Sequence, residues 1–176
     1  SDDHSELLAL LDPVLTDPGF IDEAQAAVLK SPILHDASKE QLIDAFDLLG
    51  KRKFVSAYPL FYSGLESAFT ETARSNGVLD ADNYFLKGEK KKKRKTEDLF
   101  PFLELSPQFR RYLNSWIFGD AGNPFRHGDV RDPELCRRQA LKLAAALVGW
   151  LEELGGWDDA KLANRIETAS QLQLGE

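Results

Sequence analysis

Residues 132–154, DPELCRRQALKLAAALVGWLEEL, predict the most apolar helix of the chain. Asp132 followed by Pro133 is typical of a helix N-cap with proline at the first helical position. Large apolar side chains recur there at helical spacing beside alanines, which allow a neighbouring helix to approach closely. Gly155-Gly156 then ends the helix. The residues expected to be buried are Leu135, Leu143, Leu147, Val148, Trp150, Leu151 and Leu154, next to Ala140, Ala144, Ala145 and Ala146.

A second long helix is expected over residues 52–75, with an aromatic face that fills the groove opposite those alanines. Pro59 should kink this helix or mark its true start, and Asn76-Gly77 should stop it. Glu66 lies next to Leu65 on this aromatic helix, and two orientations stay open, inward to a basic partner or outward into solvent. The aromatic face consists of Phe54, Tyr58, Phe61, Tyr62, Leu65, Ala68 and Phe69.

Apolar residues recur at helical spacing along nearly the whole chain, and no segment alternates as a half-buried strand does. We therefore predict an all-α fold in which the long helices pack as an antiparallel bundle. The shorter helices are expected at 6–11, ending before Asp12-Pro13; after Asp17-Pro18; at 38–49, opened by a Ser38 to Gln41 capping box; at 108–118; and at 158–172.

The chain has 176 residues, of which 43% are hydrophobic, and this is enough for one core of ordinary domain size. We divide it into an N-terminal helical extension, 1–50, and a bundle, 51–176. No apolar run approaches the ~20 residues that span a bilayer, and the first residues, SDDHSE, are acidic where a signal peptide is basic. The expectation is a cytoplasmic protein that does not contact a membrane.

Neither a metal nor a cofactor is expected. The three histidines are scattered without ligand spacing, and no zinc-binding signature is present. The single cysteine, Cys136, falls inside a helical pattern, which favours a small packing residue over a nucleophile.

The net charge of −7 is unevenly distributed. Residues 87–95, KGEKKKKRK, hold +6, and the rest of the chain holds −13. A basic run attracts nucleic acid by releasing counterions from the phosphates. The plainer interpretation is a solvated, mobile loop, because like charges without an apolar anchor repel one another. Both interpretations stay open.

The loop at 122–128, Gly-Asn-Pro-Phe-Arg-His-Gly, combines side chains that suit phosphate chemistry. His127 can gain or lose a proton near neutral pH, Arg126 can hold a phosphate oxygen, and Asn123 can orient either of them. The same residues can equally form a structural turn in which asparagine and proline shape the backbone.

The order of these elements resembles the HEPN superfamily (higher eukaryotes and prokaryotes nucleotide-binding domains) over about residues 54–154. The resemblance implies a helical bundle, usually dimeric, and many members are metal-independent endoribonucleases with an Arg-Asn-x-x-x-His-Gly signature. Asn123, His127 and Gly128 match that signature, but Gly122 stands where the arginine belongs. Losing that cation would remove about 2–4 kcal/mol of transition-state stabilisation, by analogy with one oxyanion donor.

The first hypothesis is an RNA-binding or endoribonuclease HEPN domain of a prokaryotic defence or toxin-antitoxin system, weakened by Gly122. His127 would be the general acid or base, Asn123 would orient it, and Arg126 would bind phosphate. A homodimer would bring two loops into one groove. Further substrate contacts are expected from Arg110, Arg111, Lys91, Lys92, Lys93, Arg94 and Glu66.

The second hypothesis is a non-catalytic HEPN-like module that dimerises or binds a protein partner, such as an antitoxin or a larger defence complex. Arg126 would then pair with Glu66 or Asp129, and the loop would be structural. A third hypothesis is a helical scaffold unrelated to HEPN domains.

Overall fold

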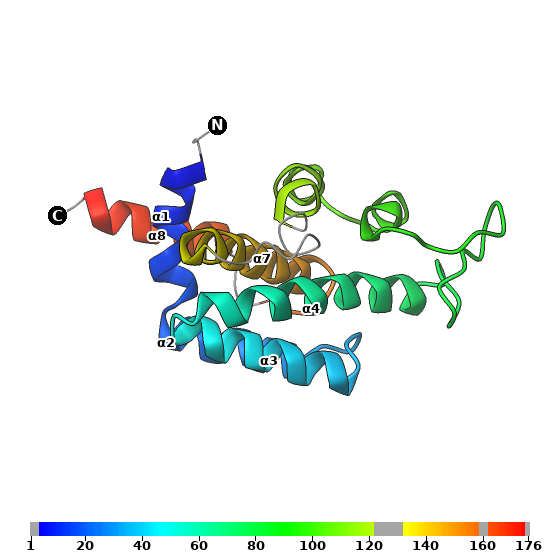
Figure 1. Cartoon of the computed structure of the whole chain (residues 1–176), viewed down its shortest axis with the longest axis horizontal. Helices are drawn as coiled ribbons and strands as arrows, with labels where there is room; N and C mark the ends of the chain where they lie inside the picture. The colour runs from blue at the N-terminus through cyan, green and yellow to red at the C-terminus, as the bar shows by residue number, and fades with distance from the viewer. Residues whose placement is uncertain (1–3, 122–131, 159–161, 175–176) are drawn as a thin grey trace.

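The computed structural model describes residues 4–121, 132–158 and 162–174, which form an all-α bundle (Figure 1). The all-α prediction is confirmed, since the described residues contain two isolated β-bridges and no strand. The helices are α1 His4–Leu15, α2 Pro18–Lys30, α3 Asp36–Gly50, α4 Phe54–Ser75, the 3-10 helix η1 Thr96–Phe102, α5 Pro107–Tyr112, the π-helix η2 Leu113–Ala121, α7 Pro133–Glu153 and α8 Leu162–Leu174.

Helix α4 lies at the centre, between α3 and α7 (Figure 1). Short connections make α2, α3 and α4 antiparallel neighbours. The two long helices α4 and α7 run in the same direction, so the antiparallel packing expected for this pair is wrong. The indole Nε1 of Trp150, near the end of α7, donates to the Thr72 hydroxyl near the end of α4 at 3.0 Å. The long connection between the two helices carries the chain back to the start of α4 before α7 begins.

One hydrophobic cluster extends from Leu8 to Trp157. Both predicted ranges, 1–50 and 51–176, contribute to it. For example, the rings of Phe46 in α3 and Phe61 in α4 meet edge to face with centroids 5.0 Å apart. The first three helices are therefore packed into the same core as α4 and α7.

Helix α1 does not end at Leu11 as expected, but continues through Pro13 to Leu15. Leu15 is fully buried, and the Asp12 carboxylate binds Arg52 and Arg137 at 2.6 Å each. Arg52 has a φ of 57°, a left-handed conformation that is uncommon outside glycine. Burial and this double ion pair hold the last turn of α1 despite the proline, and they join α1 to the beginnings of both α4 and α7.

Helix α3 begins at Asp36, so the capping box expected between Ser38 and Gln41 is wrong. The Ser38 hydroxyl donates instead to Glu71 of α4 at 2.8 Å, and the same carboxylate accepts the His35 backbone N–H at 3.2 Å. A carboxylate is favourable at a helix N-terminus because free N–H groups and the positive end of the helix dipole lie there. Glu71 therefore caps α3 from a neighbouring helix.

The helix expected at 108–118 begins at Pro107, after an N-cap at Ser106, and it is not uniform. From Leu113 it widens into a π-helix that continues past Gly119, the expected end, to Ala121. Leu113 and Ile117 are buried, as predicted. Helix α8 is shifted from the expected 158–172 to Leu162–Leu174. Among the described helices, none combines the length and the apolar content needed to cross a bilayer.

A glycine sets the approach of α3 to α4, and this predicts a position-specific effect. A Cβ added at Gly64 would lie 2.3 Å from Leu42 Cδ2 and 2.9 Å from its Cγ. Gly64→Ala should lower the free energy of unfolding by about 1–3 kcal/mol through overpacking, although alanine favours helices. Gly50→Ala is the matched control, because its nearest contact would be 3.4 Å. Urea denaturation measures both, and equal stabilities of the two variants would contradict this packing.

The Asp12 ion pairs predict a pH dependence. Hydrogen bonds from Arg52, followed by those from Arg137, lower the pKa of the Asp12 carboxyl below its ordinary 3.8. A lowered pKa stabilises the folded state above pH 3.8, and this contribution is lost as the pH falls through the folded-state pKa. Asp12→Asn should therefore be less stable than wild type at pH 7, and the difference should shrink towards pH 3. Asp44→Asn is the control, since Asp44 is exposed and makes no ion pair with a described residue. A difference independent of pH would refute the assignment.

Candidate nucleic-acid interface

The basic run belongs to a folded segment, residues 78–95, here called the basic hairpin. Isolated bridges pair Leu79 with Phe85 and Tyr84 with Lys92. The Phe85 N–H donates to the Lys91 carbonyl at 3.0 Å. The prediction of a solvated loop is therefore right for most side chains of the run, which are exposed, but not for the backbone of Lys91 and Lys93, which is hydrogen-bonded to Phe85 and Asn83.

Asn83 attaches the basic hairpin to α4. Its side-chain Oδ1 accepts from Arg74 Nε at 3.1 Å and from Arg74 Nη2 at 2.7 Å. Its backbone carbonyl accepts the Lys93 N–H at 2.8 Å. Its φ is 67°, in the left-handed region that asparagine tolerates better than most residues. Asn83 thus joins the turn and the backbone of Lys93 to the end of α4.

None of the seven cationic side chains of 87–95 makes an ion pair with a described residue. Two of them lie over aromatic rings, with Lys91 Nζ 5.9 Å from the Phe85 centroid and Lys92 Nζ 5.9 Å from the Tyr84 centroid. The predicted contacts Lys91, Lys92 and Arg94 are exposed, and Lys93 is half-buried. The hairpin therefore presents a positive surface that the rest of the described chain does not neutralise.

Glu66 binds a hydroxyl group among the described residues, and its expected pairing with a basic side chain stays a prediction, because Arg126 lies outside the residues that the structure describes. It is half-buried, and its Oε2 accepts from the hydroxyl of Thr96, the residue that follows the basic run, at 2.9 Å. Thr96 is fully buried. Glu66 therefore attaches the far end of the run to α4, and its described partner is a hydroxyl group, with no basic side chain involved. A polar hollow of about 520 Å³ adjoins it, lined by Tyr62, Ser63, Glu66, Ser67, Thr70, Glu71, Arg74 and Asn83.

Arg110 and Arg111 lie on α5, away from Glu66 and the basic hairpin. Both are exposed and make no ion pair with a described carboxylate. Together with Asn114 and Ser115 of the π-helix they line a hollow of about 420 Å³. Two guanidinium groups beside an amide and a hydroxyl suit an anion, and π-helical turns are frequent at functional sites.

The predicted catalytic residues Asn123, Arg126 and His127 lie outside the residues that the structure describes. The described chain resumes at Asp132, whose carboxylate caps α7. The beginning of α7 lies near the beginning of α4, whereas the basic hairpin follows the end of α4 (Figure 1). The predicted cations of 91–94 and the beginning of α7 are therefore at opposite ends of the long helices.

Sequence reasoning missed a buried cation beside the π-helix. Lys142 on α7 is 5% exposed, and its Nζ lies 5.5 Å from the centroid of the Trp116 ring. The Tyr112 hydroxyl donates to the Lys142 carbonyl at 2.9 Å, and burial raises the pKa of this phenol well above its ordinary value of 10.0. No signal distinguishes Lys142 in the sequence, because it reads there as an ordinary helix-surface lysine.

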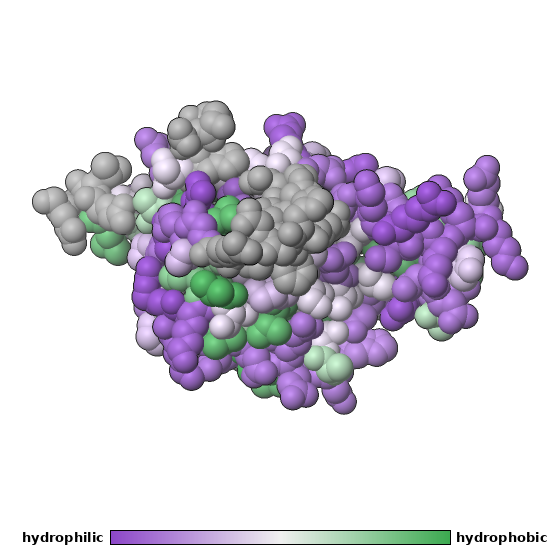
Figure 2. Space-filling view, viewed as in Figure 1, coloured by the Kyte–Doolittle hydropathy of each residue, from purple (hydrophilic) through white to green (hydrophobic). Residues whose placement is uncertain are grey.

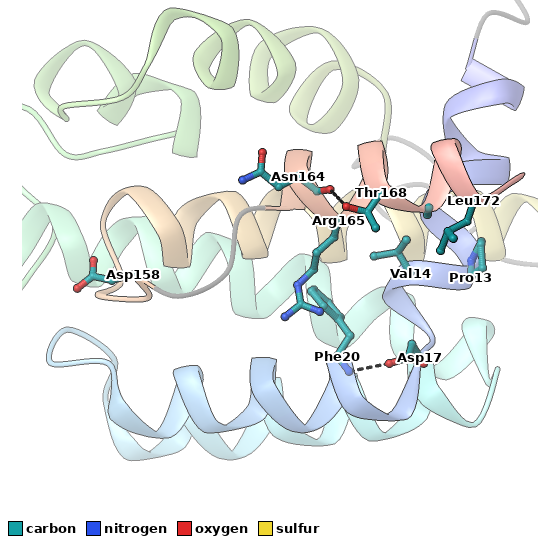
Figure 3. Close-up of a pocket in the computed structure, with 10 residues that line it drawn as sticks. Pro13, Val14, Asp17, Phe20, Asp158, Asn164, Arg165, Thr168 and Leu172 are labelled. Carbon is teal, nitrogen blue, oxygen red and sulfur yellow. Dashed lines mark hydrogen bonds between the residues drawn. The ribbon is translucent and has the colours of Figure 1, made fainter. Parts of the chain in front are cut away.

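A groove of about 780 Å³ separates α8 from the α1–α2 corner (Figure 3). Arg165 extends from α8 across it to the Phe20 ring, 5.2 Å from the centroid, and pairs with Glu23. Asp17 accepts the Phe20 N–H as the N-cap of α2 at 3.0 Å. The main polar groups of this groove thus have structural partners, so we do not assign it a ligand.

Comparison of the chain with protein-family models, with curated proteins and with solved structures finds no match. Among the described residues, no three His, Cys, Asp or Glu side chains gather in a way that could hold a metal ion. The candidate interface therefore rests on the geometry of the described residues, chiefly on the hydrogen bonds and exposed cations of the basic hairpin.

The attachment at Asn83 predicts that a single substitution releases the basic hairpin. Asn83→Ala removes two hydrogen bonds from a guanidinium, worth about 1.5–3 kcal/mol, and places alanine at an unfavourable φ. Tryptic cleavage within 87–95 should accelerate by roughly tenfold or more, because proteolysis tracks local opening. Asn76→Ala is the control, since Asn76 is an exposed residue nearby whose side chain makes no hydrogen bond to a described residue. Equal cleavage of Asn83→Ala and wild type would refute the attachment.

Proposed function

We propose that this chain is a cytoplasmic, dimeric HEPN-like domain that binds RNA through the basic hairpin. It would be related to the metal-independent endoribonucleases of prokaryotic defence or toxin-antitoxin systems. The observation that carries the proposal is the surface of seven cations, fixed to α4 through Asn83 and Thr96 and without ion pairs to described carboxylates.

The charge distribution supports a local and oriented contact with RNA. The chain outside 87–95 holds −13, so most of the molecule repels a polyanion, and the basic run is the part expected to attract it most strongly. Attraction to phosphates comes chiefly from the release of condensed counterions. A fixed hairpin also spends less conformational entropy on binding than a free tail would, because its backbone is already hydrogen-bonded.

Arg110 and Arg111 offer a second anion site for the RNA strand that binds the basic hairpin. Their hollow on α5 and η2 directly precedes residues 122–131 in the chain. In the proposed reaction the ribose 2′-oxygen attacks the phosphorus and the bond to the 5′-oxygen breaks. His127 either takes the proton of the 2′-hydroxyl or protonates the leaving 5′-oxygen, and an arginine stabilises charge on the phosphate. Arg126, Arg110 and Arg111 are the candidates for that arginine, since Gly122 occupies the place of the usual one.

A second candidate function is a non-catalytic HEPN-like module that dimerises or binds a protein partner. Gly122 favours it, because it removes the cation that the HEPN signature supplies for catalysis. The two candidates differ in whether RNA is cleaved, and they share the bundle and the dimer.

RNA binding is tested by neutralising Lys91, Lys92 and Lys93 together to glutamine. The affinity should fall, and the dependence of log K on log salt should become less steep by about 2, since each phosphate contact contributes about 0.7 on a single strand. Fluorescence anisotropy with labelled single-stranded RNA at several salt concentrations measures both. The control variant neutralises Lys30, Lys51 and Lys53, exposed lysines outside the basic hairpin, and has the same net charge. Equal losses in both variants would show that only net charge matters, contrary to the proposal.

Cleavage is followed in the same samples by gel electrophoresis. If wild type cleaves RNA, His127→Ala should abolish the activity, and undiminished cleavage would remove His127 from the mechanism. If wild type binds without cleaving, Gly122→Arg separates the two candidates. Gained cleavage indicates a catalytic site that lacks its arginine, and continued inactivity favours the binding module.

A further inference from the structure

Two aromatic rings are exposed on or next to the basic hairpin. Phe102, at the end of η1, is 54% exposed, and Tyr84 is 38% exposed. Phe102 packs against Phe85, with ring centroids 5.5 Å apart, while Phe85 itself is 9% exposed. Phe85 therefore supports an outer ring that keeps about half of its surface in water.

Two lysines lie over rings of this group. Lys92 lies over the exposed Tyr84, and Lys91 lies over Phe85, the ring that supports Phe102, each with Nζ 5.9 Å from the ring centroid. These contacts place positive charge beside the aromatic rings. The basic hairpin lies at the right-hand end of the molecule in Figure 2. This end is mainly hydrophilic, with a few less polar residues among the charged ones.

This combination matches one chemical class of partner. Exposed aromatic faces interleaved with cations are what unpaired bases and their phosphates require, because bases stack on the rings while the backbone follows the charges. An A-form duplex does not meet this requirement, since its bases are already stacked and its deep groove excludes side chains. An acidic peptide would satisfy the lysines but leave the flat ring faces without a matching partner.

We propose that the exposed rings of Tyr84 and Phe102 each stack an unpaired base of single-stranded RNA, with Lys91 and Lys92 holding its phosphates; these two rings and two lysines are here called the stacking platform. The platform rests on the RNA-binding function proposed above and makes it selective for unpaired strands. Lysines supply the salt-dependent part of the affinity, and the rings supply a part that salt does not change. These two parts are separable by experiment.

The test compares a labelled single-stranded RNA with a blunt duplex of equal length, over a range of salt, for wild type and Phe102→Ala. Wild type should bind the single strand more tightly. Phe102→Ala should weaken single-strand binding by about 5- to 100-fold, the range for one stacked base, with an unchanged salt dependence. Duplex binding should stay within about twofold, since rings do not reach stacked bases.

Three further variants keep the result interpretable. Phe102→Tyr retains a ring and should bind the single strand like wild type, whereas Tyr84→Ala should weaken it as Phe102→Ala does. Leu86→Ala is the matched control, because Leu86 is an apolar residue of the same hairpin, 56% exposed, that has no ring. Thermal unfolding of each variant establishes that the fold is kept.

The outcomes distinguish failure of the stacking platform from failure of the proposed RNA binding. Equal affinity for single strand and duplex, or ring variants that bind like wild type, would overturn the platform while leaving RNA binding in place. Absence of binding to either RNA would overturn the proposed function, and the platform with it.

Discussion

The hydrogen bonds from Arg74 to Asn83 determine whether the basic run is part of an ordered hairpin on the bundle or a flexible, solvated loop. A guanidinium at the end of α4 holds an asparagine that turns the chain, and that asparagine holds the backbone of Lys93. Without these bonds seven like charges would repel one another into solvent. With them, the backbone that carries Lys91 and Lys93 is held next to the end of α4.

Helix α4 organises the rest through polar side chains as well as through its apolar face. Glu71 caps α3, Thr72 receives the Trp150 indole of α7, Glu66 holds Thr96, and Arg74 holds Asn83. Each bond joins α4 to a different segment. Because buried polar groups must be paired, these bonds specify which segments meet, and the hydrophobic core supplies most of the stabilisation.

The all-α class and most long helices could be predicted from spacing, since apolar periodicity and the caps at Asp17 and Asp132 act locally. Elsewhere, contacts with residues distant in the sequence decide the local structure. The Ser38 hydroxyl donates to the Glu71 carboxylate and does not form a capping box. Ion pairs at Asp12 stabilise the last turn of α1, which continues past Pro13. The direction of α7 relative to α4, the π-helix and the roles of Arg74 and Asn83 depend on long-range contacts that no short motif encodes. Of the predicted site residues, the cations at 91–94 lie on one hairpin and Glu66 binds Thr96 just after it, whereas Arg110 and Arg111 do not join them.

Amide hydrogen exchange at Lys93 and Phe85 tests the central claim most directly, since these N–H groups bind the Asn83 and Lys91 carbonyls. A hydrogen-bonded hairpin predicts that both amides exchange well below the rate of an unstructured peptide, while Lys90 and Lys92, whose N–H groups make no hydrogen bond to a described residue, serve as internal comparisons in the same run. Exchange of Lys93 and Phe85 at the unstructured rate would contradict the account, because the cations would then belong to a free tether and not to a surface.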